Sequence, residues 1–205
     1  MCDLVAFWGL CFQLGAGTAL PGLLAAKLGA RVILTDKHDN HEVLGSYTRV
    51  SEINGVQEKV SMLPLKWGLF DAGFFELPKL DAIIAADCFY DPKDFDNILA
   101  TVFALMKANP SCVFVTVYQE RSSRRSLQPL LLKWGMSCRA VEASSFGFDE
   151  EKAENYGAIV KDFKEKVASL FLFEIFLQGL LLCSVVCGWD SVVTYRRLAD
   201  LFFSC

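Results

Sequence analysis

The chain lacks an excess of positive charge, since 20 Lys and Arg stand against 24 Asp and Glu, a formal net charge of -4. DNA and RNA attract proteins largely through their phosphates and call for a basic patch, so we expect no direct nucleic-acid partner. The first four residues, Met-Cys-Asp-Leu, also lack the basic stretch of a secretory signal, and we expect an intracellular protein. With 205 residues, of which 53% are hydrophobic, the chain is long enough for one well-buried α/β domain.

The sequence is also poor in clustered metal ligands. Its eight cysteines form no Cys-x-x-Cys pair, and its two histidines are His38 and His41. Structural zinc sites need four Cys or His ligands, usually in closely spaced pairs, so no metal is expected. Cys11, Cys112 and Cys138 stand inside apolar runs. We expect them to be small buried side chains in a reducing compartment.

What the sequence does contain is an alternation of apolar runs and helical patterns. The runs predict strands over Leu10–Leu14, Val32–Thr35, Val60–Leu65, Leu80–Ala86, Cys112–Tyr118 and Ser137–Val141. The periodic segments predict helices over Ala19–Leu28, His41–Ile53, Asp94–Met106 and Ser126–Trp134. This order is typical of an α/β fold, a three-layer sandwich around a mostly parallel sheet. Ligands are then expected at the carboxyl ends of the strands.

The pattern changes near residue 148, and we predict a domain over residues 1–148 followed by a tail over 149–205. Asp149–Val167 is charged and predicted to be helical, whereas Leu170–Trp189 is almost continuously apolar. A run of about 20 residues can span a bilayer. However, Glu174 within it would cost roughly 2–3 kcal/mol unless it is paired or protonated. A helix or strand docked on the domain is therefore preferred to a membrane span, and a poorly folding tail remains a third alternative.

A glycine turn and an acid mark the first half of the chain. Gly15-Ala-Gly17-Thr-Ala-Leu-Pro-Gly22 follows the first apolar run, and Asp36 closes the second, 21 positions after Gly15. Such glycines let the backbone approach a ligand, and an acid about 20 residues later is placed to receive ribose hydroxyls. The pattern indicates an adenosine-containing cofactor.

Three local features favour S-adenosylmethionine over a nicotinamide. The turn reads Gly-x-Gly-x-x-x-Pro-Gly, which differs from the Gly-x-Gly-x-x-Gly of dinucleotide sites. Trp67-Gly68 follows the third run, where a flat ring can lie against an adenine face. Asp87-x-x-Tyr90 follows the fourth run, close to the expected position of a transferable methyl group. Structural roles stay open for these residues, because Asp87 also suits a cap and Trp67 and Tyr90 also suit packing.

Together, Leu14–Gly22, Leu65–Gly68 and Ala86–Tyr90 resemble motifs of the seven-strand protein methyltransferases of family 16. Four further stretches resemble one subgroup of that family: Ile98–Thr101, Leu105–Pro110, Tyr118–Arg121 and Leu132–Trp134. The resemblance covers about residues 10–146. It implies a Rossmann-like class I methyltransferase sandwich and an enzyme that methylates lysine or arginine of proteins. The subgroup is associated with histone arginine methylation in the nucleus and cytoplasm.

The resemblance also implies roles for particular residues. The cofactor-binding residues would be Gly15, Ala16 and Gly17 at the methionine part, Asp36 at the ribose, and Trp67 and Ala86 beside the adenine. The catalytic wall between the cofactor and the substrate nitrogen would consist of Asp87, Phe89 and Tyr90. The implied cofactor is S-adenosylmethionine without a metal, and the implied partner is a histone tail or a chaperone-type protein. The Asp-x-x-Tyr pattern does not decide between arginine and lysine, so a lysine methyltransferase of non-histone proteins and a catalytically weak binding variant remain alternatives.

The sequence departs from the family pattern at three places. Only about a dozen residues precede the glycine turn, so we expect a shortened N-terminus without the family's covering segment. Gln13 stands where the family usually has an acid that accepts a hydrogen bond near the turn, and a neutral amide accepts less strongly. The run after Leu170 does not resemble the family's final strand hairpin. We therefore expect a site that binds its cofactor less tightly than its relatives do.

Overall fold

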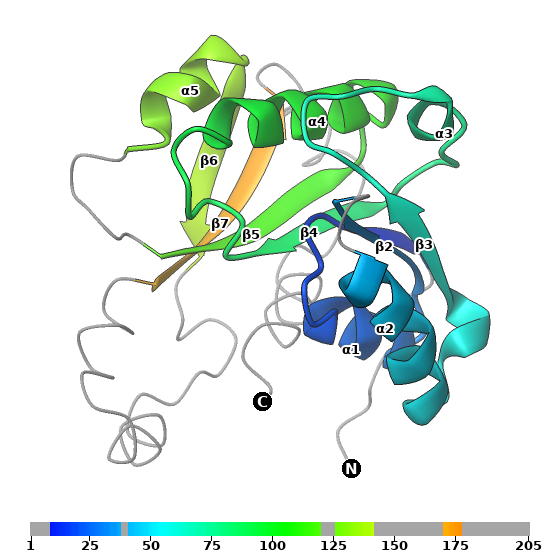
Figure 1. Ribbon diagram of the computed structural model, residues 1–205. Coiled ribbons are helices and arrows are strands. Elements are labelled where there is room, and N and C mark those ends of the chain that lie inside the picture. The colour runs from blue at the N-terminus through cyan, green and yellow to red at the C-terminus, as the bar shows by residue number, and fades with distance from the viewer. Residues whose placement is uncertain (1–8, 38–40, 120–125, 142–169, 178–205) are drawn as a thin grey trace, which may run out of the picture.

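The structure is a computed structural model that describes residues 9–37, 41–119, 126–141 and 170–177. The predicted helix over Asp149–Val167 and the residues 178–189 of the apolar run lie outside these ranges. The described strands form a seven-stranded sheet in the order β3-β2-β1-β4-β5-β7-β6 (Figure 1). Neighbouring strands from β3 to β5 pair in parallel, whereas β7 runs antiparallel to both β5 and β6.

The predicted α/β order is confirmed. The strands are β1 (Leu10–Gln13), β2 (Arg31–Asp36), β3 (Val60–Pro64), β4 (Ala82–Ala86), β5 (Val113–Gln119), β6 (Met136–Val141) and β7 (Leu170–Leu177). The helices are α1 (Leu20–Lys27), α2 (His41–Ile53), α3 (Ala72–Phe75), α4 (Phe95–Ala108) and α5 (Gln128–Lys133), with a 3-10 turn η1 over Gln57–Lys59. Neither α3 nor η1 was predicted, because three or four residues are too few to show a helical period.

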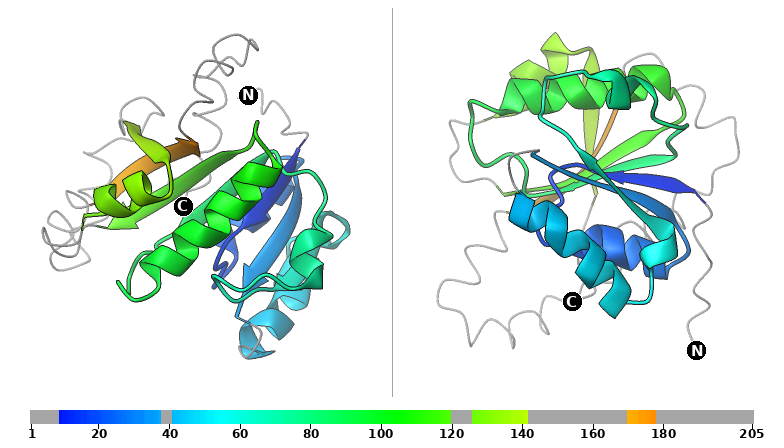
Figure 2. Two further views of the ribbon diagram at one scale, coloured as in Figure 1. Left: turned by 90° about the horizontal axis from the view of Figure 1, so that it is seen from above. Right: turned by 45° about the vertical axis from the view of Figure 1, so that its right-hand side comes forward.

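Helices cover both faces of the sheet, with α1 and α2 on one side and α4 and α5 on the other (Figure 2). Successive side chains of a strand point to opposite faces, so each strand contributes to two cores. In β1, for example, Cys11 packs on the side of α1 while Phe12 packs on the side of α4. Both side chains are essentially inaccessible to solvent, as expected for a parallel sheet with two covered faces.

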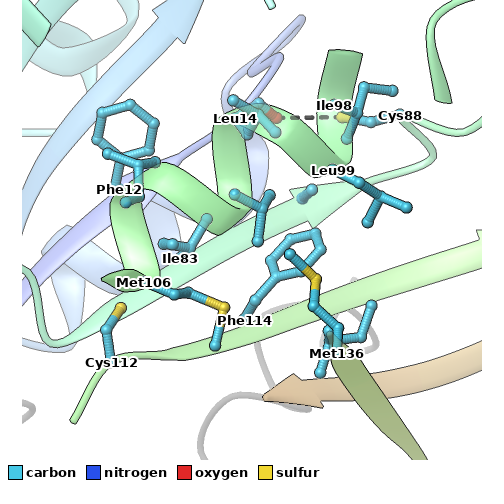
Figure 3. Close-up of a cluster of buried hydrophobic side chains, with 14 of the residues drawn as sticks. Phe12, Leu14, Ile83, Cys88, Ile98, Leu99, Met106, Cys112, Phe114 and Met136 are labelled. Carbon is cyan, nitrogen blue, oxygen red and sulfur yellow. Dashed lines mark hydrogen bonds between the residues drawn. The ribbon is translucent and has the colours of Figure 1, made fainter. Parts of the chain in front are cut away.

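The core under α4 follows from the helical spacing of its apolar residues. The predicted face of Phe95, Ile98, Leu99, Val102 and Leu105 is buried along its whole length. These side chains meet residues of β1, β4 and β5, as Figure 3 shows for Ile98 and Leu99 against the sheet. The amphipathic helix α4 thus covers one face of the sheet with its apolar side.

The apolar run after Leu170 begins with a strand that joins the sheet. Leu170–Leu177 is a strand between β5 and β6, so the docked-strand alternative is confirmed for these residues. Its side chains pack on both faces of the sheet, with Ile175 and Leu177 in one core and Leu172 in the other, and a strand buried on both faces reads as a continuous apolar run. Its glutamate, Glu174, is 2% exposed and accepts a hydrogen bond from Arg139 Nη2 at 2.6 Å, which offsets the cost of burying the carboxylate.

Two further observations concern the cysteines and membranes. Cys11 and Cys112 are buried as predicted, whereas the same prediction for Cys138 is wrong, because it lies exposed on β6 at the edge of the sheet. Among the helices of the described ranges, none is both long and apolar enough to cross a bilayer.

Candidate cofactor and active site

The glycine turn lies between β1 and α1 and depends on two left-handed backbones. Gly15 has a φ of +57° and Gly17 a φ of +51°, a region that side chains with a Cβ rarely adopt. A Cβ added to Gly15 would lie 2.8 Å from Trp67 Cζ2, whereas one added to Gly17 would meet nothing within 4 Å. The missing side chain of Gly15 therefore makes room for the Trp67 ring, and that of Gly17 leaves open space beside the turn.

Between these glycines, Ala16 ties the turn to the neighbouring strand. Its N–H donates to the carbonyl of Thr35 at 2.7 Å, and the Thr35 hydroxyl donates to the Gln13 carbonyl at 2.8 Å. The Gln13 side chain is 1% exposed, and its Oε1 accepts from the Gly22 N–H at 2.8 Å. Gln13 thus accepts the hydrogen bond near the turn that the family's acid was expected to accept, with an amide oxygen in place of a carboxylate.

Asp36 stands half-buried at the carboxyl end of β2, facing the glycine turn. Its Oδ2 accepts from the Gly17 N–H at 2.9 Å, and its Oδ1 accepts from the Lys37 N–H at 2.9 Å. The Tyr47 hydroxyl donates to Oδ2 at 3.3 Å. A carboxylate offers about four acceptor positions, so within the described part of the chain one remains for a ribose hydroxyl.

Tyr47 is a site residue that sequence reasoning missed. It lies on the buried face of α2, its side chain is fully inaccessible, and its hydroxyl reaches Asp36. Burial, together with the nearby Asp36 carboxylate, raises the pKa of Tyr47 above its usual range, so the hydroxyl stays a donor. The available signal was a tyrosine among apolar side chains on a helix that follows the acid-bearing strand.

Trp67 comes from the turn after β3 and packs against the glycine turn. Its ring is half-buried, and Lys37 Nζ lies 5.9 Å from the ring centroid, within cation–π range. The next residue, Gly68, has a φ of +78°, and its N–H donates to the Thr101 hydroxyl at 2.9 Å. Trp67, Gly15 and Asp36 therefore meet at one edge of the sheet, as the strand-end argument predicts.

The end of β4 contributes the next group. Ala86 is its half-buried last residue, and the exposed Asp87 has a left-handed backbone with φ +52°. The Asp87 N–H donates to the carbonyl of Val117 at 3.1 Å. Such a backbone is uncommon outside glycine and is found more often at functional sites.

Cys88 joins β4 to β1 and was not singled out from the sequence. Its side chain is 3% exposed, and its Sγ donates to the Leu14 carbonyl at 3.1 Å, the dashed contact in Figure 3. Burial, aided by the carboxylates of Asp87 and Asp36, raises the pKa of the Cys88 thiol to about 12. The thiol thus stays protonated and holds the turn and the β4 end together.

The structure separates the two aromatic residues of the Asp-x-x-Tyr segment. Phe89 is 2% exposed, with its ring centroid 5.4 Å from Phe95 and 6.4 Å from Tyr118, inside the core under α4. Tyr90 is 44% exposed. Tyr90 and Asp87 thus lie at the surface of this strand end, while Phe89 packs beneath it.

Elsewhere, the described residues offer little that competes with this site. No three His, Cys, Asp or Glu of the described ranges come together to hold a metal ion. A recess of about 240 Å³ includes Leu10, Arg31 and Val60, which begin β1, β2 and β3. It therefore lies at the amino ends of these strands, away from the predicted residues.

The comparisons with known proteins agree with this geometry. The family described as lysine methyltransferase matches residues 10–129. The mouse histone-arginine methyltransferase METTL23 is 41% identical over 139 residues, which cover 68% of this chain and 54% of that protein. The mouse protein N-lysine methyltransferase METTL21A is 35% identical over 97 residues, 47% of this chain and 44% of that protein. A solved geranyl diphosphate methyltransferase in complex with SAM shares the fold, with a TM-score of 0.54 at 12% identity over 84% of this chain and 79% of that chain.

The fold is that of the Rossmann-like, S-adenosylmethionine-dependent methyltransferases. Within that class, the chain belongs to the lysine methyltransferase family, which confirms the family resemblance read from the motifs. It spans 54% to 61% of the length of the mouse, Xenopus laevis and rat METTL23 proteins that it matches.

Proposed function

We propose that this chain is a protein N-methyltransferase that uses S-adenosylmethionine and acts on arginine of histones. The observation that carries the proposal is the meeting of Gly17, Asp36, Trp67 and Asp87 at the carboxyl ends of β1 to β4. The similarity to histone-arginine methyltransferases supports the arginine substrate.

The residues present fit the cofactor. Gly17 leaves open space where a Cβ would stand, and Asp36 is fixed by the turn that it faces. In this proposal Gly15, Ala16 and Gly17 lie along the methionine part, Asp36 receives the ribose, and Trp67 and Ala86 flank the adenine. When bound, S-adenosylmethionine supplies an electrophilic methyl group on a sulfonium, whose departure needs no acid.

The remaining task of the protein is to position the accepting nitrogen. A guanidinium stays protonated under nearly all conditions, so it needs a carboxylate that orients and polarises it. Asp87 provides one at the surface of the β4 end, next to the exposed Tyr90 ring, which can stack on the guanidinium. Phe89, between them in the sequence, anchors the segment in the core through its contacts with Phe95 and Tyr118. Holding two reactants in line contributes about 7–11 kcal/mol when the geometry is right.

A second candidate is methylation of lysine in a non-histone protein. The description of the matching family and the similarity to METTL21A favour it. A lysine must lose its proton before attack, and desolvation of its amine beside the Tyr90 ring, once the substrate covers the site, would lower its pKa. The two substrates are distinguished by the residue that carries the label after reaction with a radiolabelled methyl donor.

The deciding experiment is calorimetric titration of the chain with S-adenosylhomocysteine, followed by methyl transfer to histone H3. Asp36→Ala should abolish binding of the cofactor product. Asp87→Ala should leave that binding intact and remove methyl transfer. Equal losses of binding in both variants would contradict the division of roles. If the folded protein does not bind S-adenosylhomocysteine at millimolar concentration, the enzyme proposal fails. The alternative of a catalytically weak variant that acts by binding other proteins would then describe the chain better.

For location, we propose the cytoplasm and nucleus, on the strength of the subgroup resemblance. Fractionation of cells that express a tagged full-length chain, with the tag detected in each fraction, tests this proposal. Recovery of the tag only with membranes would overturn it.

A further inference from the structure

We propose that three exposed apolar side chains around α3 dock the segment of the substrate protein that adjoins the methylated residue. Leu69, Phe70 and Phe75, the α3 surface, are 58%, 41% and 75% exposed. The inference rests on the proposed function and names how its substrate is recognised. The expected occupant is a cationic peptide that also carries apolar side chains. Neighbouring exposed apolar residues of this size are typical of interaction sites.

The α3 surface is held firmly from below. Phe74 is 7% exposed within the core under α4, and Asp71 caps the helix by accepting from the Phe74 N–H at 3.0 Å. The ring of Phe74 contacts both outer rings, with centroids 4.8 Å from Phe70 and 5.7 Å from Phe75. The outer rings are thus supported by a buried anchor while their other sides face solvent. Rigid aromatic side chains of this kind lose little entropy on binding.

The α3 surface also begins beside the proposed active site. Leu69 follows Trp67-Gly68, and the Gly68 N–H donates to Thr101 Oγ1 of α4 at 2.9 Å. A Cβ on Gly68 would lie 2.6 Å from Asn97 Oδ1, so this backbone touches the first half of α4. Figure 1 shows α3 on the same side of the sheet as α4, near the end of α4 that lies opposite the β4–α4 loop, with the segment after β3 running back from α3 along α4. A peptide on the α3 surface can follow that segment past Leu69 and Gly68 toward the β4–α4 segment, which carries Asp87.

The negative charge of the nearby β4–α4 segment favours a cationic peptide on the α3 surface. The β4–α4 segment, residues 87–96, contains four aspartates and one lysine. Asp96 is paired with Lys133 at 2.7 Å, and Asp94 stands one helical turn before Asn97, the residue that Gly68 touches. A basic peptide that crosses from the α3 surface meets this acidic segment. A second copy of the chain, with its net charge of -4, would meet like charge.

The test compares Phe75→Ser with Ile53→Ser in the full-length chain. Ile53 is 72% exposed at the end of α2, on the opposite face of the sheet, and so matches Phe75 in exposure but not in place. The probe is a fluorescent synthetic peptide with arginine, lysine and two leucines, measured by anisotropy with S-adenosylhomocysteine present. We expect Phe75→Ser to weaken peptide binding about fivefold, as is usual for loss of an aromatic contact. Ile53→Ser should leave it unchanged, and both variants should bind the cofactor product normally.

The outcomes separate this proposal from the proposed function. Equal peptide affinities in wild type and Phe75→Ser, or equal affinities for the peptide and its leucine-to-serine version, would overturn docking on the α3 surface. Docking that depends on Phe75 without methyl transfer to any basic peptide would overturn the enzyme proposal alone. Sedimentation that shows a wild-type dimer and a Phe75→Ser monomer would make the surface a self-association face and also overturn the docking proposal.

Discussion

Tyr47→Phe removes one hydroxyl from a side chain that touches no solvent, and that hydroxyl supports the proposed ribose-binding carboxylate. Hydrogen bonds to charged groups contribute about 1.5–3 kcal/mol, and the O–O distance of 3.3 Å to Asp36 is long, so we expect about 1 kcal/mol. The ring and its packing stay in place. Because Asp36 then loses part of its orientation, the dissociation constant for S-adenosylhomocysteine should rise by up to about fivefold, measured by calorimetric titration.

The same change should lower the free energy of unfolding by about 1 kcal/mol in urea titrations. A double-mutant cycle with Asp36→Ala isolates the contact, because Tyr47→Phe should cost little once its acceptor is gone. Thr48→Val, an exposed change one residue further along α2, serves as the control. Unchanged binding in Tyr47→Phe, or fully additive stability losses in the cycle, would refute this role of Tyr47.

Three other predictions concern the glycine turn, the ion pair of Glu174 and the buried thiol of Cys88. Gly15→Ala should lower the unfolding midpoint clearly more than Gly17→Ala, since both backbones are left-handed but only the Gly15 Cβ would meet an aromatic ring at 2.8 Å; equal shifts would contradict this. Arg139→Met should lower the free energy of unfolding by about 1–2 kcal/mol, because it removes the cation that pairs with the buried Glu174. The double variant Arg139→Met, Glu174→Leu should recover most of this loss. The free energy of unfolding should fall as the pH rises above about 9, because the unfolded chain releases thiol protons that the folded chain retains. Cys88→Ala should reduce this pH dependence by up to about 1.4 kcal/mol per pH unit. An unchanged pH dependence in urea titrations from pH 8.5 to 10.5 would count against this role of Cys88.

The local order of elements could be predicted because it rests on short-range signals. The predicted helix over His41–Ile53 agrees with α2 at both ends, and the predicted strand over Val60–Leu65 differs from β3 by one residue. Asp36 was placed at a strand end by its spacing from the glycine turn, and the structure puts it against Gly17. Residue types and their spacing within one strand–helix–strand unit determine each of these features.

Contacts between distant residues could not be predicted in the same way. The apolar run Leu170–Trp189 favours a docked helix or strand without deciding between the two, and only the pairing of Leu170–Leu177 with β5 and β6 makes that part a strand. Its Glu174 is tolerated because Arg139, 35 positions away, reaches it. Cys138 looked buried in its run but is exposed, because it lies on β6, the last strand at the edge of the sheet.

The sequence by itself determined the family motifs, the strand–helix order and the identity of the acid at the end of β2, because those depend on residue type and spacing. Only the tertiary structure decided which side chains support them. Tyr47 reaches Asp36 from helix α2, Cys88 reaches Leu14 from the neighbouring strand end, and Phe89 turns into the core while Tyr90 stays outside. Such contacts depend on the crossing of elements far apart in the chain, which no local pattern encodes.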